Sequence, residues 1–170
     1  LALVEEHWPE HYALTVFLAA YGLRWGEATA LSRADVDWEA GELRVARSHV
    51  RGSVTPTKSD SIRLLPLSDR LRMVLEGHLR RTYPEDHITS AEDLLFPNRD
   101  GNYRTPSSVS RAWRDVSSRM EHPWELKPHD LRRTCSNLLR LAGAGLVTAQ
   151  ALLGHSSNEM SLHYSHVGME

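Results

Sequence analysis

The densest group of polar residues in this sequence runs from His129 to Arg133 and reads H-D-L-R-R. It directly follows Pro128, which favours the first turn of a helix, so His129 and Arg132 are expected three residues apart on one helical face. An imidazole, a guanidinium and the exposed amides of a helix N-terminus together suit an oxyanion such as a phosphate. Taken alone, the segment is better explained as an ordinary capped and charged helix start.

Three other segments carry residues that handle phosphates or protons. Arg24 lies in the turn G-L-R-W-G-E, where two glycines leave little side chain to cover it. Lys58, one of two lysines in the chain, lies where a hairpin is expected, and His155 ends the segment L-L-G-H. Tyr164 follows nine residues after His155. Singly, these are a glycine-rich turn, a solvated lysine, a histidine at a helix C-terminus and a core tyrosine.

In this order the segments resemble the tyrosine recombinase (phage integrase) family. The family pattern is an arginine in a G-L-R-x-x-E turn, a hairpin lysine before a V-P-L-like strand, H-x-L-R, L-G-H and a late tyrosine. The matching positions are Arg24 with Glu27, Lys58 before Leu65-Pro66-Leu67, His129 with Arg132, His155 and Tyr164. The match extends from Leu1 through Tyr164. Arg133 stands where the family often has histidine, and Tyr21 where threonine is common.

The resemblance implies site-specific DNA recombination, in which one strand at a time is cut and rejoined through a 3′-phosphotyrosyl intermediate. Tyr164 would attack the phosphorus, and Lys58 would protonate the leaving 5′ oxygen. Arg24 and Arg132 would offer forked donors to the non-bridging oxygens. The phosphotyrosyl bond would keep the energy of the broken linkage, so the strands can rejoin without ATP.

The histidines also permit a second interpretation, a metal site. His163 and His166, with His155 or His129, would be the ligands, but C-x-x-C and H-E-x-x-H patterns are absent and no acids stand among them. The resemblance implies instead that His129 accepts a proton or binds the phosphate and that His155 is a second donor. We expect no cofactor and no metal.

Three other functions remain open at this point. A type IB topoisomerase-like enzyme would nick and religate DNA without exchanging strands between duplexes. A DNA-binding module would keep the fold and lack catalysis, although the complete set of six matching residues argues against it. A helical regulator without a nucleic-acid role would show no salt-dependent DNA binding.

The charge distribution favours a nucleic-acid partner more than the formal net charge of −2 does. Residues 1–42 hold eight acids and two bases, a balance of −6, whereas residues 43–170 hold 18 bases and 14 acids, a balance of +4. All bases except Lys58 and Lys127 are arginines, whose planar fork suits phosphate. The arginines predicted to contact the DNA backbone are Arg44, Arg47, Arg51, Arg63, Arg99 and Arg104.

Length and composition are those of a single globular domain. The chain has 170 residues, 41% hydrophobic and 25% charged, and no apolar run long enough to span a membrane. The single cysteine, Cys135, cannot form an internal disulfide and is predicted to be a small core residue, which indicates a cytosolic protein. The resemblance implies a bacterial or phage-encoded protein, located in the cytoplasm and associated with the nucleoid.

The pattern of apolar residues predicts a mainly α fold with a small antiparallel β-sheet (α+β). The family resemblance implies the fold of an integrase catalytic domain. A helix with Thr105 as N-cap and an apolar stripe of Leu131, Leu138, Leu139 and Leu141 are expected. The expected helices cover 9–21, 27–31, 68–83, 105–120, 128–141, 146–153 and a last segment with Met160, Leu162 and Tyr164; the expected strands cover 42–50 and 62–67.

We expect one catalytic domain over residues 1–170. Family members usually carry a separate helical DNA-clamping domain before this one, and we expect that domain to be absent from this chain. The resemblance also implies double-stranded DNA as the partner and self-association as a tetramer on DNA in the full-length protein. Phage integrases, transposon recombinases and chromosome-dimer resolvases share the pattern, and the sequence does not choose among them.

Overall fold

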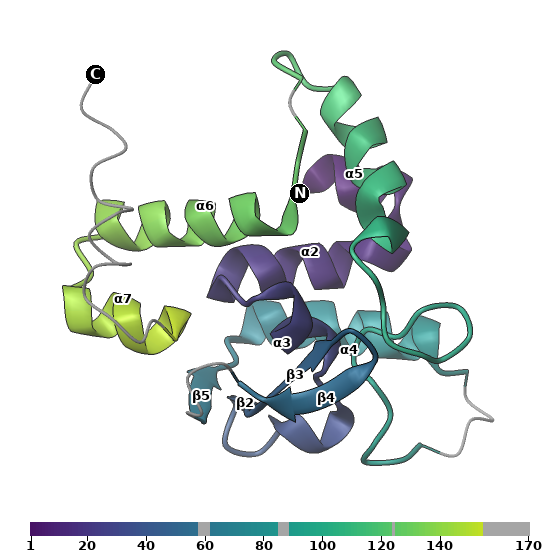
Figure 1. Cartoon of the computed structure of the whole chain (residues 1–170), viewed down its shortest axis with the longest axis vertical. Helices are drawn as coiled ribbons and strands as arrows, with labels where there is room; N and C mark the ends of the chain where they lie inside the picture. Colours follow the sequence, from purple (N-terminus) through teal and green to yellow (C-terminus); the bar gives the residue numbers. More distant parts are fainter. Residues whose placement is uncertain (58–61, 85–88, 124, 155–170) are drawn as a thin grey trace.

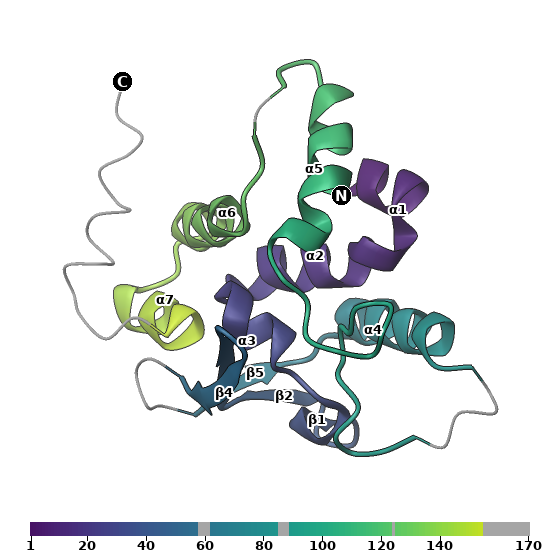
Figure 2. The same ribbon diagram turned by 45° about the vertical axis from the view of Figure 1, so that its right-hand side comes forward.

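The computed structural model describes residues 1–57, 62–84, 89–123 and 125–154 (Figure 1). In the described residues three α-helices come first, five short antiparallel strands follow, and four further α-helices come last, which confirms a mainly α fold with a small sheet (Figure 2). The elements are α1 (Ala2–His7), α2 (Pro9–Tyr21), α3 (Trp25–Thr29), a 3-10 turn (Arg33–Asp35), β1 (Val36–Asp37), β2 (Glu42–Val45), β3 (Arg47–Val50), β4 (Ser53–Pro56), β5 (Arg63–Pro66), α4 (Asp69–Thr82), α5 (Ser107–Ser118), α6 (Pro128–Leu141) and α7 (Leu146–Leu153).

Helix α2 forms the centre of the molecule, with α6 on one side and α4 on the other (Figure 1). Pro9 is compatible with its first turn, and Gly22, at φ 58°, ends it in the left-handed conformation that glycine adopts most readily. Phe17, fully buried on α2, meets the ring of Tyr21 at 5.6 Å and that of Phe96 at 5.4 Å between centroids. The core therefore joins α2 to the loop that precedes α5.

The strands form a three-stranded antiparallel sheet, ordered β1-β2-β5, and a separate β3–β4 hairpin. One strand was expected over 42–50, but the chain leaves the first sheet after Val45, and β3 pairs only with β4. Arg51 and Gly52, at φ 50° and 85°, connect β3 to β4 as the two central residues of a tight turn. Arg51 adopts this conformation although arginine is not a typical turn residue, which explains why the sequence pattern did not predict it.

The helix predictions hold for α2, α4, α6 and α7 within a residue or two at each end. Ser68 caps α4 by accepting a hydrogen bond from the amide of Leu71 (3.4 Å), as expected. Pro106, rather than Thr105, occupies the N-cap position of α5. The last predicted helix, at 160–164, lies outside the described residues.

The predicted apolar stripe on α6 is buried only in part. Leu138 and Leu141 are 57% and 73% exposed, whereas Leu131, Arg132 and Cys135 are buried. The Cys135 thiol donates to the carbonyl of Ala20 on α2 (3.3 Å), and burial raises its pKa to about 11. The prediction that Cys135 is a small core residue is thus confirmed, and α6 packs on α2 through an arginine and a thiol as well as through leucine.

Two buried histidines should make the free energy of unfolding depend on pH. The pKa of both His11 and His78 is lowered to about 4, chiefly by burial, and the charge of Arg104 contributes to this lowering. His11 accepts from Arg104 through Nδ1 (2.6 Å), which favours its neutral ring. For His78, burial outweighs the hydrogen bond from Nε2 to the carbonyl of Leu95 (3.0 Å), which by itself raises the pKa, so this ring is neutral as well.

Because the unfolded chain binds these protons near pH 6.5, the stabilisation is complete above that pH and is lost as the pH falls toward about 4. We expect the free energy of unfolding, measured with urea, to decrease by a few kcal/mol between pH 7.5 and pH 5. His78→Gln should weaken this pH dependence, whereas His122→Gln, at an exposed position, should not. An unchanged slope in His78→Gln would contradict the assignment.

No helix among residues 1–57, 62–84, 89–123 and 125–154 is long and apolar enough to cross a membrane. In that same part of the chain no group of three or more His, Cys, Asp or Glu side chains is placed to hold a metal ion.

Candidate active site

Arg24 lies in the tight turn between α2 and α3, as the two glycines around it predicted. It is the N-cap residue of α3, with an extended backbone, and its side chain is about one quarter exposed. A Cβ atom on Gly22 would lie 2.5 Å from a methyl carbon of Leu153, and one on Gly26 would lie 2.6 Å from the carbonyl oxygen of His49. The glycines therefore let α7 and β3 approach the turn closely.

Glu27 holds Arg24 in this turn. One carboxylate oxygen accepts from the Arg24 guanidinium (2.8 Å), and the other accepts from the Arg24 amide (2.9 Å). Glu27 is 1% exposed, and burial by itself would raise its pKa. The charge of Arg63 and the hydrogen bonds from Arg24 outweigh burial and lower the pKa, so the carboxylate stays ionised at neutral pH.

Arg132 approaches the same turn from the opposite side. It lies on α6, three residues after His129, and is 5% exposed. Its guanidinium donates to the carbonyl of Gly22, at the end of α2, and to the carbonyl of Leu153 (2.6 Å). The side chain thus ties α6 to both α2 and α7.

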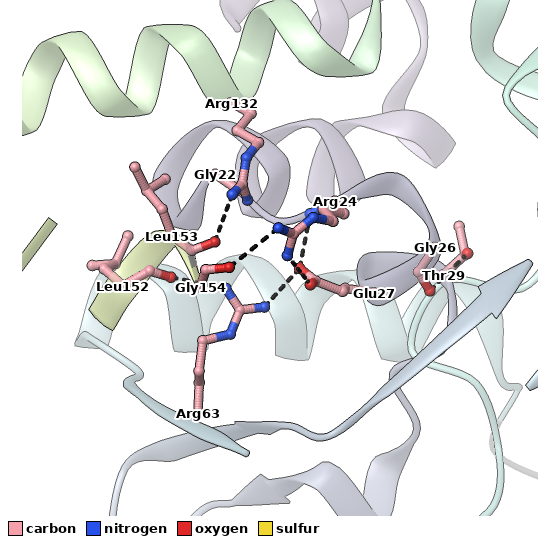
Figure 3. A network of polar contacts seen from close by, with 10 residues as sticks. All are labelled: Gly22, Arg24, Gly26, Glu27, Thr29, Arg63, Arg132, Leu152, Leu153 and Gly154. Carbon is pink, nitrogen blue, oxygen red and sulfur yellow. Dashed lines mark hydrogen bonds and ion pairs between the residues drawn. The ribbon is translucent and has the colours of Figure 1, made fainter. Parts of the chain in front are cut away.

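The carbonyls at the C-terminal end of α7 bring three arginines together (Figure 3). Arg63 donates to Leu152 (3.1 Å), Arg132 to Leu153 (2.6 Å) and Arg24 to Gly154 (3.1 Å). A helix C-terminus carries partial negative charge, which favours cations there. Among the described residues, three guanidinium groups and one carboxylate, that of Glu27, meet in this cluster, and this balance is positive and suits an anion.

Of the six residues predicted to be catalytic, the structure brings Arg24 and Arg132 together and describes a third, His129. His129 is exposed in the first turn of α6. Lys58, His155 and Tyr164 lie outside the described residues. In the sequence, Lys58 follows β4 by two residues and His155 comes directly after Gly154.

The six arginines predicted to contact DNA fall into three groups. Arg44, Arg51 and Arg99 are exposed. Arg47 is also exposed, but its guanidinium pairs with Asp35 at 2.6 Å and with the hydroxyl of Ser32 at 2.9 Å. The remaining two are Arg63 and Arg104.

Arg63 and Arg104 are buried, at 7% and 8% exposure, and their guanidinium groups bind protein groups. Arg104 donates to the carbonyls of Pro97 (2.8 Å) and Glu10 (3.3 Å) and to His11. Both guanidinium groups therefore make contacts within the protein that were not expected, and contact of either group with DNA stays a prediction.

The sequence pattern was not used to predict that Arg63 belongs to this cluster. The pattern that reveals it is the alternation along β5, in which Arg63, Leu65 and Leu67 are buried while Ile62, Leu64 and Pro66 are exposed. An arginine in register with two leucines predicts a buried guanidinium that needs a partner.

Trp25 supports the turn from its other side. Its indole nitrogen donates to the carbonyl of Arg104 (3.3 Å), and its ring meets Trp113 edge-on at 6.3 Å. These contacts hold the start of α3, directly after Arg24, against Arg104 and Trp113.

Comparison with known proteins identifies the family of this chain. The phage integrase family model matches residues 4–170. The putative prophage phiRv2 integrase of Mycobacterium tuberculosis (strain ATCC 25618 / H37Rv) is 32% identical over 175 residues, covering 98% of this chain and 45% of that protein. The chain therefore spans about half the length of the curated relatives it matches.

Two solved structures share the fold. The Tn1549 transposon integrase in complex with circular intermediate DNA superposes with a TM-score of 0.81 at 20% identity, covering 99% of this chain and 59% of that one. The XerH site-specific recombinase, bound to a palindromic difH substrate in a post-cleavage complex, has a TM-score of 0.66 at 25% identity, covering 98% and 44%.

Proposed function

Because this chain belongs to the phage integrase family, we propose that it is the catalytic domain of a site-specific tyrosine recombinase. One observation carries the proposal. Arg24 and Arg132 are far apart in the sequence, yet their guanidinium groups bind neighbouring carbonyls at the end of α7. Both residues match the arginines of the family pattern, and their cluster has the positive charge that a scissile phosphate requires.

In the proposed reaction the Tyr164 oxygen attacks the phosphorus of one DNA strand. The phenol proton passes to a base, the role proposed for His129, as a bond forms between the phenol oxygen and phosphorus. The bond from phosphorus to the 5′ oxygen breaks, leaving a 3′-phosphotyrosine and a 5′ hydroxyl. Lys58 supplies the proton to the leaving oxygen. A 5′ hydroxyl of a partner strand then attacks the phosphotyrosine and releases Tyr164.

Arg24 and Arg132 stabilise the charge on the non-bridging oxygens in both steps. Preorganised donors of this kind are commonly worth about 3 kcal/mol each in the transition state. His129 accepts a proton or binds the phosphate, and His155 is a second donor.

The proposed partner is double-stranded DNA, on which copies of the longer protein assemble as tetramers. Such an enzyme acts in the cytoplasm, at the nucleoid of a bacterium. The XerH relative, solved after cleavage of its own DNA substrate, supports DNA as the substrate class.

Covalent capture tests the proposal without a known target site. The chain is incubated at low salt with a pool of duplexes that carry a randomised central segment, the protein is denatured, and DNA that stays attached is sequenced. We expect attached DNA with a shared sequence, linked through a 3′ phosphate. A pool that yields no attached DNA, while bound DNA is recovered without denaturation, would indicate a binding module instead.

The same protein separates recombination from topoisomerase-like activity. Two labelled duplexes with the captured sequence should exchange strands if the protein is a recombinase. Relaxation of a supercoiled plasmid without any exchange would favour the type IB topoisomerase-like alternative.

DNA binding should decrease steeply as the salt concentration rises. Contacts to phosphates release counterions, so the logarithm of the association constant should decrease linearly with the logarithm of the salt concentration. Arg51→Gln and Arg99→Gln, at exposed positions, should each reduce the slope by about one if they contact a phosphate.

Arg80→Gln is the matched control, because Arg80 is an exposed arginine on α4 outside the predicted contacts. Titration of a labelled duplex at several salt concentrations measures the slope. Affinity that is insensitive to salt would contradict phosphate binding by the arginines.

A further inference from the structure

Arg63 occupies a position in the sheet where an apolar residue is normally found. It is paired with Val45 in the β2–β5 register, on the face that buries Leu43 and Leu65. Its side chain is 6% exposed. A buried guanidinium costs several kcal/mol of desolvation unless partners offset it, so its contacts indicate what it does.

The Arg63 side chain contacts both the carboxylate that binds Arg24 and the C-terminal end of α7. It pairs with one oxygen of Glu27 at 2.6 Å, while the other oxygen of Glu27 accepts from the guanidinium of Arg24. It also donates to the carbonyl of Leu152 on α7 (3.1 Å). Figure 3 shows Arg63 below Glu27 and the α7 end, on the side opposite Arg132.

The close fit at Gly154 restricts Arg63 further. A Cβ atom on Gly154 would lie 2.6 Å from Nη1 of Arg63 and 2.8 Å from its Cζ. Gly154 also has φ 64°, so this glycine both ends α7 and makes room for the guanidinium. The segment that Arg63 contacts is the one whose carbonyls hold Arg24 and Arg132.

We propose that Arg63 is a positioning residue for the scissile phosphate: by holding Glu27 and the end of α7, it orients the guanidinium of Arg24 next to that of Arg132. The inference rests on the proposed function, and it assigns Arg63 no contact with DNA. Arg63 acts only through Glu27 and the α7 carbonyls. Displacing a catalytic group by about 1 Å can cost about 100-fold in rate, so this role has a measurable effect.

A set of three substrates shows which catalytic group loses its position. The first carries the ordinary phosphodiester at the cleavage site. The second carries a methylphosphonate there, which replaces one charged non-bridging oxygen by a methyl group and so reduces the need for guanidinium charge. The third has a bridging 5′ sulfur, which leaves without a proton and so reduces the need for an acid.

The test variants are Arg63→Met, which removes the charge, and Arg63→Lys, which keeps it. A lysine has a single ammonium group in place of the planar fork that reaches both Glu27 and Leu152, so both variants should be impaired. Arg24→Ala and Lys58→Ala provide the reference patterns. Leu64→Met, on the exposed face of the same strand, is the matched control.

We expect both Arg63 variants to cleave the phosphodiester about 10- to 100-fold more slowly than the unchanged chain. On the methylphosphonate the loss should shrink to a few-fold, as for Arg24→Ala, and the 5′ sulfur should not restore cleavage. Each variant is compared on all three substrates in one preparation, so the ratios do not depend on the folded fraction.

Other patterns overturn the inference. Equal losses on the phosphodiester and the methylphosphonate would mean that Arg63 has only a structural role. Rescue by the 5′ sulfur would mean that Arg63 acts on the leaving-group acid, and unchanged cleavage of the phosphodiester would mean that it positions nothing. If the unchanged chain forms no adduct with captured DNA, the proposed function itself fails, and the inference fails with it.

Discussion

Tyr164→Phe is expected to abolish the covalent protein–DNA adduct while folding and non-covalent DNA binding survive. The substitution removes the attacking oxygen and little volume, so the fold loses almost nothing. No other oxygen of the side chain can replace the phenol, and the loss should be complete on the phosphodiester and the 5′-thio substrate alike. Denaturing gels of DNA labelled at the cleavage site measure the adduct.

Lys58→Ala is the informative contrast, because it should also slow the cleavage of normal DNA. Its defect lies in protonating the 5′ oxygen, and a bridging sulfur leaves readily without that proton. Lys58→Ala should therefore recover cleavage on the 5′-thio substrate, whereas Tyr164→Phe should not. If the sulfur rescues neither variant, Lys58 is not the acid.

Tyr103→Phe is the matched control for the nucleophile. The ring of Tyr103 stacks on that of His49, with centroids 4.1 Å apart and planes 9° apart, and phenylalanine preserves this stack. We expect Tyr103→Phe to form adducts normally. Adducts that persist in Tyr164→Phe and vanish in Tyr103→Phe would make Tyr103 the nucleophile.

Arg132→Ala is expected to produce the second large effect, a loss of about 100- to 1,000-fold in the cleavage rate, since a preorganised donor is removed. The same change leaves the carbonyls of Gly22 and Leu153 without the donors that Arg132 gives them. Each unsatisfied buried carbonyl costs about 1–3 kcal/mol, so the free energy of unfolding should decrease as well.

Two further variants separate these effects. Arg132→Lys keeps the charge but loses the fork that reaches two carbonyls, and it should remain strongly impaired in cleavage with a smaller loss of stability. Arg140→Lys, at an exposed position at the end of α6, should change neither quantity. Single-turnover cleavage and urea unfolding measure the two effects, and a fully active Arg132→Lys would contradict bidentate phosphate binding.

The local signals in the sequence were sufficient for most of the helices. Pro9 and Gly22 delimit α2, Ser68 caps α4, and Pro128 begins α6, because proline, serine and glycine favour particular backbone conformations whatever surrounds them. The sequence also determined the family, because several short motifs occur in one order, and it placed Arg24 in a turn between two helices.

Tertiary structure decided which arginines form the site. Arg44, Arg63 and Arg104 look alike in the sequence, yet only Arg44 is exposed, because the burial of an arginine depends on which face of the sheet or loop meets the core. The leucines of α6 show the same limit: Leu138 and Leu141 are apolar but exposed, because the face of α6 that meets α2 carries Arg132 and Cys135.

The cluster itself depends on contacts that no local pattern encodes. Arg24, Arg63 and Arg132 bind three successive carbonyls of α7, and backbone carbonyls are the same in every residue, so the sequence carries no sign of which will be used. The sequence alone determined which residue types are available for phosphate chemistry. Only the packing of α2, α6, α7 and β5 brings Arg63, buried opposite Val45, to the carboxylate of Glu27. The same carboxylate binds Arg24.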